Sequence, residues 1–163
     1  MKKINTILAC VDFSGYTRMT LEAAVAIARG THAQIVVFNV INQRDVASVG
    51  MVSRYYPDRL NVENYVQDLK KERHENLITL IDSDFSEHRK KMTFIVDVGI
   101  PWESIIQAAE THKADLIVMA NKGRGNLSRV LFGSVAEKVF RHSPVPVVSV
   151  RDPDTFKGRH HNG

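Results

Sequence analysis

Five short apolar runs recur along the chain, with segments of helical periodicity between them. They are Ile7–Val11, Gln34–Val40, Met92–Val98, Asp115–Ala120 and Val145–Val150. Runs of this length with little polar alternation are typical of strands that are covered on both faces in a parallel sheet. Helices between such strands must lie on the faces of the sheet, because right-handed crossovers place them there. The sequence therefore predicts a doubly wound α/β domain.

Four segments supply the helical periodicity. Met19 to Ala28 places apolar residues on one face, and residues 62–81 show the amphipathic pattern of a surface helix. Pro101 stands where it can start a helix, and residues 134–141 again have helical spacing. Residues 41–60 show no clear period, so we expect a long connection there, and long loops in compact domains are often functional.

Length and composition limit the class of protein. The 163 residues suit one domain and leave too little chain for a second core. The apolar runs are far shorter than the roughly 20 residues of a membrane-spanning helix, so we expect no membrane segment. Asp12 interrupts the first apolar run before any signal-peptide cleavage site, which predicts a cytoplasmic protein. The one cysteine, Cys10, lies in an apolar run and predicts a buried, inert thiol.

The charge distribution argues against a nucleic-acid partner. The formal net charge of +4 is modest, and the basic clusters are short. The densest cluster is Arg89-Lys90-Lys91, and no aromatic residues alternate with it for base stacking. We therefore expect no nucleic-acid binding.

The carboxyl ends of the predicted strands hold the best candidates for a ligand site. In doubly wound sheets a ligand lies beyond these ends where the strand order reverses, and Asp12 and Ala120 both stand at strand ends. A glycine-containing turn before a helix exposes backbone N–H groups that hold phosphate oxygens. The residues available for such a cradle are Gly123, Gly125, Gly133 and Ser134. On their own, these glycines could equally well serve only to make turns. The segment matches neither the dinucleotide fingerprint nor the phosphate-loop motif.

Five segments, in their order and spacing, resemble the universal stress protein family. They are Val11-Asp12-Phe13-Ser14, Val98-Gly99-Ile100-Pro101, Asp115-Leu116-Ile117-Val118-Met119-Ala120, Gly123-Arg124-Gly125-Asn126-Leu127-Ser128-Arg129 and Gly133-Ser134-Val135. The resemblance implies a universal stress protein domain over residues 1–151. It also implies the Rossmann-like fold of the adenine nucleotide alpha hydrolases, a five-stranded parallel sheet with strand order 3-2-1-4-5. The polar residues 152–163 predict a flexible tail.

The ATP-binding branch of that family carries a Gly-x2-Gly-x9-Gly-Ser/Thr segment. By resemblance, its second glycine, third glycine and hydroxyl residue fall on Gly123, Gly133 and Ser134. Ala120 stands where the first glycine is expected. Alanine adds a methyl group and disfavours positive φ, so a ribose can approach closely there only if the backbone is extended.

The resemblance implies a set of nucleotide-binding residues. Asp12 would lie near the adenine and ribose, Val40 would frame the base, and Met119 would contact the sugar. Arg124 and Arg129 could reach polyphosphate oxygens, since a guanidinium group binds them in bidentate fashion, although arginines on a loop are more often simply solvated. The full predicted set is Val11, Asp12, Val40, Met119, Ala120, Gly123, Arg124, Gly133, Ser134 and Val135. Without the resemblance, Asp12 is equally well a helix cap, and Val40 and Met119 are equally well core residues.

Little in the chain points to catalysis. Ser14 follows Asp12 in a turn, but no Gly-x-Ser-x-Gly elbow surrounds it. The seven histidines form no metal-ligand spacing with Cys10 or with paired carboxylates. We therefore expect no metal site built from side chains, and a divalent ion such as Mg²⁺ or Mn²⁺ would come with the phosphates of a nucleotide. The chain is not expected to be an efficient enzyme, with weak ATP hydrolysis left open.

Three functional hypotheses remain. The first is a stress or regulatory protein that binds ATP, ADP or AMP and reports energy state to an unidentified protein partner. The second is an interaction protein of the same family that does not bind nucleotide, a hypothesis supported mainly by Ala120. For both, the resemblance implies a homodimer through the edge strand at residues 145–150. The third, an enzyme of adenylate chemistry, would need a catalytic group that the sequence does not locate.

Overall fold

Strands and helices alternate along the chain, as the sequence predicts. The computed structural model describes residues 3–122 and 133–155. The strands are β1 (Thr6–Cys10), β2 (Gln34–Asn42), β3 (Met92–Gly99), β4 (Leu116–Ala120) and β5 (Val147–Val150). The helices are α1 (Thr17–Thr31), α2 (Gln43–Ser53), α3 (Val62–Asp84), α4 (Pro101–Thr111) and α5 (Ser134–His142), with short 3-10 turns η1 (Ser86–Lys91) and η2 (Pro153–Thr155).

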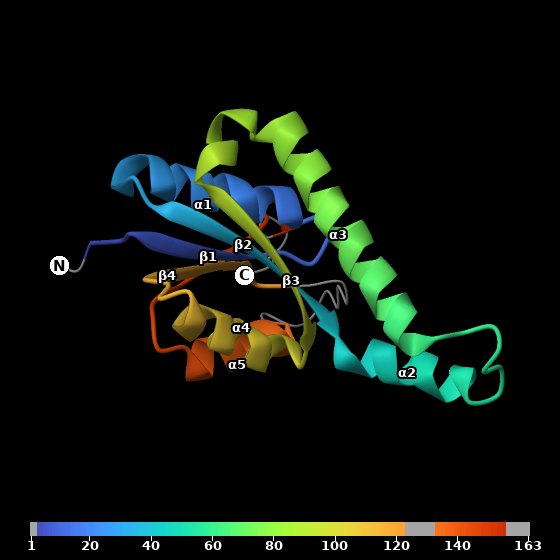
Figure 1. The fold of residues 1–163 in the computed structure, drawn as a ribbon. Coiled ribbons are helices and arrows are strands. Elements are labelled where there is room, and N and C mark those ends of the chain that lie inside the picture. Colours follow the sequence, from blue (N-terminus) through green and yellow to red (C-terminus); the bar gives the residue numbers. More distant parts are fainter. Residues whose placement is uncertain (1–2, 123–132, 156–163) are drawn as a thin grey trace.

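The five strands form one parallel sheet with the order β3-β2-β1-β4-β5. This confirms the predicted fold class and strand order. Helices α1 and α3 cover one face of the sheet, and α4 and α5 cover the other (Figure 1). Because successive side chains of a strand point to opposite faces, Ile7 and Ala9 pack in the first layer and Leu8 packs in the second. No helix within the described residues is long and apolar enough to cross a membrane.

The segment expected to be an aperiodic connection contains a helix. Residues 41–42 end β2 and residues 43–53 form α2, so the prediction of a connection without period over 41–60 was wrong for most of its length. The Asn42 side chain caps α2 by accepting a hydrogen bond from the Arg44 backbone N–H. None of the eleven residues of α2 is buried, which is why the segment lacks the apolar stripe of a core helix.

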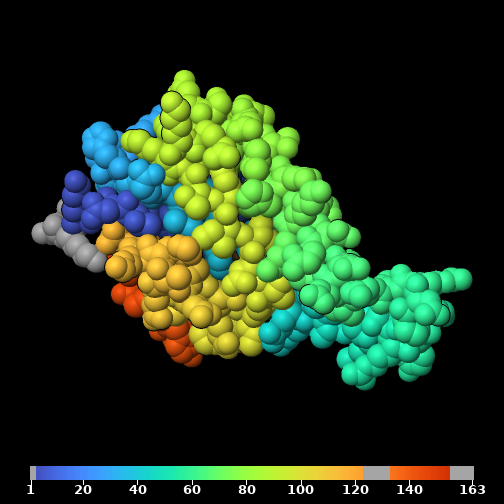
Figure 2. Space-filling model, in the orientation of Figure 1, coloured from blue at the N-terminus to red at the C-terminus, as the bar shows by residue number. Residues whose placement is uncertain are grey.

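Helix α2 and the first half of α3 project from the body of the protein as an arm, which we define as residues 43–72 (Figures 1 and 2). The buried residues of α3 are Leu77 and Ile81, and both lie beyond the arm. Tyr55 is 82% exposed and Met51 is 66% exposed. The arm therefore makes few contacts with the core and presents apolar side chains to the solvent.

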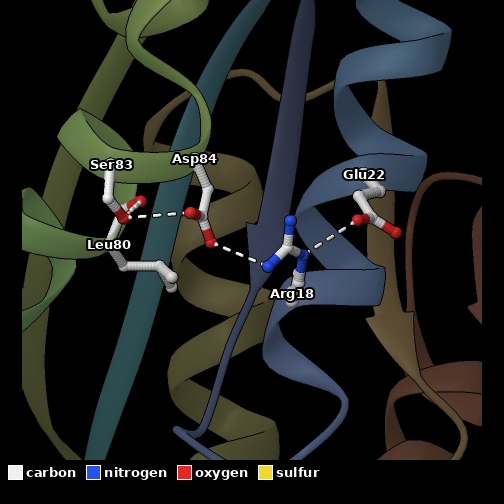
Figure 3. A network of polar contacts seen from close by, with 5 residues as sticks. All are labelled: Arg18, Glu22, Leu80, Ser83 and Asp84. Carbon is white, nitrogen blue, oxygen red and sulfur yellow. Dashed lines mark hydrogen bonds and ion pairs between the residues drawn. The ribbon is translucent and has the colours of Figure 1, made fainter.

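An ion-pair network ties the far end of α3 to α1 (Figure 3). The Arg18 guanidinium lies 3.1 Å from a Glu22 carboxylate oxygen and 3.2 Å from a carboxylate oxygen of Asp84. Arg18 and Glu22 are largely exposed, so each pair contributes at most about 1 kcal/mol to stability.

On the opposite face, one aromatic contact links α4 to α5. The Trp102 ring lies 5.0 Å from the His142 ring, measured between centroids, and the Lys138 ammonium lies 5.5 Å from the Trp102 centroid. Such contacts add about 0.5–1.5 kcal/mol beyond the area that they bury. They fix the relative position of two helices that both begin at the carboxyl edge of the sheet.

Candidate functional site

A cavity of about 380 Å³ opens at the carboxyl edge of the sheet. Strand β1 ends at Cys10, whereas its neighbour β2 continues to Asn42, so the space above the end of β1 is not filled by a strand. The strand order reverses on either side of β1, since β2 and β3 lie on one side and β4 and β5 on the other. This is the position at which doubly wound sheets bind ligands.

The cavity brings together predicted residues from four separate parts of the sequence. Its lining includes Val11, Asp12, Val40, Met119, Ala120, Gly133, Ser134 and Val135. The two remaining members of the predicted set, Gly123 and Arg124, lie outside the described residues, as do Gly125 and Arg129. Eight of the ten predicted residues therefore share one cavity.

One part of the cavity wall is apolar. Met119 is 6% exposed and packs, with Ile105 and the half-buried Val40, among the core residues of the α4 and α5 layer. Val11 belongs to the core of the other layer. A flat apolar group placed here would contact side chains from both layers of the fold.

Asp12 stands in the turn between β1 and α1. One oxygen of its carboxylate accepts a hydrogen bond of 3.0 Å from the Ser14 backbone N–H, and Phe13 between them has a φ of 59°. Helix α1 begins at Thr17, three residues after Ser14, and Tyr16 is its N-cap residue. Asp12 thus closes the turn before α1 and is not the N-cap residue of the helix.

Another part of the wall is the start of α5. Gly133, its N-cap residue, has an extended backbone with φ −66° and ψ 157°, and the Gly133 N–H donates to the Asn121 carbonyl oxygen at 2.8 Å. No side chain of a described residue caps this helix end. The first N–H groups of a helix lack partners within the helix and attract anions, and Ser134 adds a hydroxyl beside them.

Ala120 has the backbone that a close approach needs. It lies in β4, where it pairs with Val150, and it is not among the described residues that have positive φ. The alanine in place of the first motif glycine therefore causes no backbone strain.

Among the cavity residues that the sequence analysis missed, three lie where α2 and α3 meet the body of the protein. Asn42 and Asp45 lie at the start of α2, and Arg73 projects from α3. For Arg73 a signal was available, because Leu69, Arg73 and Leu77 are four residues apart and so share one face of the helix. An arginine within an apolar stripe indicates a partner on the body of the protein.

Two further chemical features of the site are clear. Burial raises the pKa of the Cys10 thiol, which lines the cavity. No group of three or more His, Cys, Asp or Glu side chains suited to a metal ion occurs within residues 3–122 and 133–155.

Comparison with known proteins identifies the family. The sequence profile of the Universal stress protein family matches residues 3–151. The chain belongs to the universal stress protein family. The match spans the sheet, both helical layers and the arm of this universal stress protein.

Individual relatives agree with this assignment. Universal stress protein MJ0577 of Methanocaldococcus jannaschii is 29% identical over 151 residues, which cover 89% of this chain and 93% of MJ0577. The solved structure of MJ0577 superposes with a TM-score of 0.72 and covers 93% of this chain and 98% of its own. UspA of Lactobacillus plantarum, at 24% identity, has a TM-score of 0.65 and covers 93% of this chain and 100% of its own.

A third neighbour is a universal stress protein crystallised in complex with cAMP. It has a TM-score of 0.56 and 20% identity, with 92% of this chain and 98% of its own covered. At this identity the likeness concerns the fold.

Proposed function

We propose that this universal stress protein binds an adenine nucleotide in the cavity above β1. The observation that carries the proposal is the meeting of Val11, Val40, Met119 and Ser134, which are distant in sequence, around one cavity at the switch point of the sheet. The cavity combines an apolar wall with the start of a helix. A nucleotide has the matching parts, a flat base and an anionic phosphate chain.

The base would lie against the apolar wall, between Val11 on one side and Val40 and Met119 on the other. The ribose hydroxyls would donate to the Asp12 carboxylate, since a carboxylate that accepts from the Ser14 N–H has capacity for more than one hydrogen bond on each oxygen. The extended backbone at Ala120 would allow the sugar to approach.

The phosphates would lie at the start of α5. Backbone N–H groups following Gly133 and the Ser134 hydroxyl would donate to phosphate oxygens there. Lys122 lines the cavity and supplies a positive charge. We further propose that Gly123 and Arg124 complete the cradle, and that Mg²⁺ or Mn²⁺ would enter with the phosphates of ATP.

We infer a regulatory role in the cytoplasm and not efficient catalysis. A hydrolase would need a positioned base near the phosphates, and the carboxylates in the described lining are Asp12, which we assign to the ribose, and Asp45, at the start of α2. Nucleotide occupancy would then act by stabilising one conformation or assembly, which a protein partner recognises.

The edge strand β5 supports a second part of the proposal, a homodimer through residues 145–150. Strand β5 is the last in the sheet order, and Val147 to Ser149 are only partly buried in the single chain. The Pro146 and Val150 carbonyls accept from β4, so by alternation the Val147 N–H faces outward. Val147→Pro should therefore block pairing between copies without removing a hydrogen bond to β4, and sedimentation velocity would show a loss of dimer.

The decisive experiment is calorimetric titration of nucleotide-free protein with ATP, ADP, AMP and cAMP, the last because of the cAMP-bound neighbour. We expect at least one to bind, and Gly133→Val to weaken it by at least about tenfold, because a branched side chain would enter the phosphate path. Gly30→Val, on α1 and without any neighbour within 4 Å of the added Cβ, is the matched control.

Each result has one meaning. If none of the four nucleotides binds the wild type, nucleotide binding is overturned, and the interaction-protein hypothesis takes its place. If the wild type binds and a folded Gly133→Val variant binds equally well, the ligand occupies a different site.

A further inference from the structure

The base of the arm forms part of the cavity wall. Asn42 and Asp45 line the cavity where the chain leaves β2 for α2, and Arg73 lines it where the chain returns along α3. Figure 1 shows both ends of the arm meeting the body at the carboxyl edge of the sheet. A molecule in the cavity would therefore contact both ends of the arm.

Arg73 on α3 forms hydrogen bonds with residues near the end of β2. Its Nη1 donates to the Asn39 side-chain oxygen at 2.8 Å and lies 3.2 Å from the Val40 carbonyl oxygen. Asn39 is only 1% exposed, and its Nδ2 donates in turn to the Val11 carbonyl oxygen at 2.8 Å. The Arg73 guanidinium thus contacts Asn39 and Val40 of β2 directly. Through the Asn39 amide it also holds Val11, the residue that follows β1.

These contacts involve Val11 and Val40, the residues that we propose to hold the adenine base. Strand β1 no longer pairs with β2 beyond Phe38, whose carbonyl accepts from the Val11 N–H. By the alternation of a parallel strand, the backbone of Val40 faces the same side as that of Phe38, toward the cavity. Arg73, which lies on α3, donates a hydrogen bond to the Val40 carbonyl oxygen. This contact sets the orientation of the last residues of β2.

We propose that Arg73 is a positioning residue of the nucleotide site, which holds Val11 and Val40 in place and couples occupancy of the cavity to the arm. The proposal rests on the proposed function. A ligand that needs Arg73 docked favours the docked arrangement of α3, and coupling of this kind is reciprocal. The arm would then become better ordered when nucleotide binds, and its exposed face at Met51 and Tyr55 would be presented in one orientation.

The chemistry of the side chain explains the choice of arginine. A guanidinium group presents several N–H donors in a fixed plane, so it can reach a side-chain oxygen and a backbone carbonyl together, whereas lysine offers a flexible point charge. Arg73→Lys should therefore keep the charge and restore only part of the function. Arg73→Met keeps most of the aliphatic stem and removes every donor.

The test compares Arg73→Met and Arg73→Lys with Lys71→Met, an exposed position two residues away whose ammonium lies 4.0 Å from Glu75. Two quantities are measured on the full chain, the dissociation constant of ATP (or of whichever tested nucleotide binds the wild type) and the change in hydrogen exchange of residues 43–72 on adding it. We expect Arg73→Met to weaken binding by about tenfold and to abolish the added protection of the arm. We expect Arg73→Lys to fall between Arg73→Met and the wild type, and Lys71→Met to match the wild type.

The outcomes separate the two proposals. If the wild type binds none of the nucleotides, the proposed function itself fails. If the wild type binds and Arg73→Met binds equally well, or if nucleotide leaves exchange in residues 43–72 of the wild type unchanged, the role of Arg73 is overturned. If Arg73→Met does not fold, Arg73→Lys decides the question, because unchanged affinity and unchanged arm protection in that variant contradict the need for a guanidinium group.

Discussion

The Asn39 side chain joins the ends of two strands by donating from Nδ2 to the Val11 carbonyl oxygen at 2.8 Å. Asn39 is buried, and its amide oxygen accepts from Arg73. Both ends of the amide are therefore satisfied, which is the condition under which a polar side chain is tolerated in a core.

We predict that Asn39→Leu lowers the free energy of unfolding by about 1–3 kcal/mol, because the Val11 carbonyl loses its partner in a buried site. Urea denaturation measures the change. Asn64→Leu, an exposed position on α3, is the control and should change the free energy by less than about 0.5 kcal/mol. Equal stability of the two variants would contradict the role of the amide.

Ala120→Gly is predicted to change nucleotide affinity by less than about threefold. The β4 backbone is already extended at this residue, so glycine has no strain to relieve. Ala120→Leu should weaken binding by more than about tenfold, because a larger side chain enters the cavity. Calorimetric titration checks both variants, and a gain of about tenfold in Ala120→Gly would show that the methyl group obstructs the ligand.

Gly99→Ala is predicted to destabilise the fold by about 1–3 kcal/mol through overpacking. A Cβ at Gly99 would overlap the Ser104 hydroxyl oxygen, whereas the Ser104 Cβ lies at an ordinary distance of 3.7 Å. Adding Ser104→Ala should therefore remove most of the penalty, and thermal unfolding of the two single variants and the double variant measures this coupling. Additive losses would contradict the clash.

The Cys10 thiol is predicted to react slowly with iodoacetamide. Burial raises its pKa, so the reactive thiolate is scarcer at a given pH than in a free thiol. At pH 8 we expect a rate at least about tenfold below that of the same protein in urea, and the folded rate should still rise above pH 9. Since Cys10 is the one cysteine of the chain, mass spectrometry follows it without ambiguity. Equal rates in the folded and unfolded protein would contradict the burial effect.

The parts of the fold that the sequence predicts well are those in which local pattern and burial agree. Ile7 to Val11 and Leu116 to Ala120 are continuous apolar runs, and they became the central strand and its neighbour. The last two residues of β2, Ile41 and Asn42, were missed because Asn42 looks like the start of a loop. Asn42 is both the last residue of β2 and the N-cap residue of α2, where its side chain accepts from the Arg44 N–H.

The residues of the candidate site could likewise be predicted only in part from the sequence. Residues at strand ends and at the start of α5 follow from topology, so Asp12, Ala120 and Ser134 could be assigned together. Arg73 stands out as an arginine in the apolar stripe of α3, but it could not be assigned to this site, because its partner Asn39 is 34 residues away along the chain. The role of the predicted residues as nucleotide ligands stays a prediction until the titrations are made.

Trp102, which contacts His142, is an intrinsic fluorescence probe of the protein. The chain has one tryptophan, and it lies on the α4 and α5 side, whereas the exposed Tyr55 and Tyr56 lie on the arm. Tryptophan emission therefore follows the layer whose helices begin at the cavity, and tyrosine signals come mainly from the projecting arm, because Tyr16 is the one tyrosine outside it. The two ends of the coupling can be observed separately in the unlabelled protein.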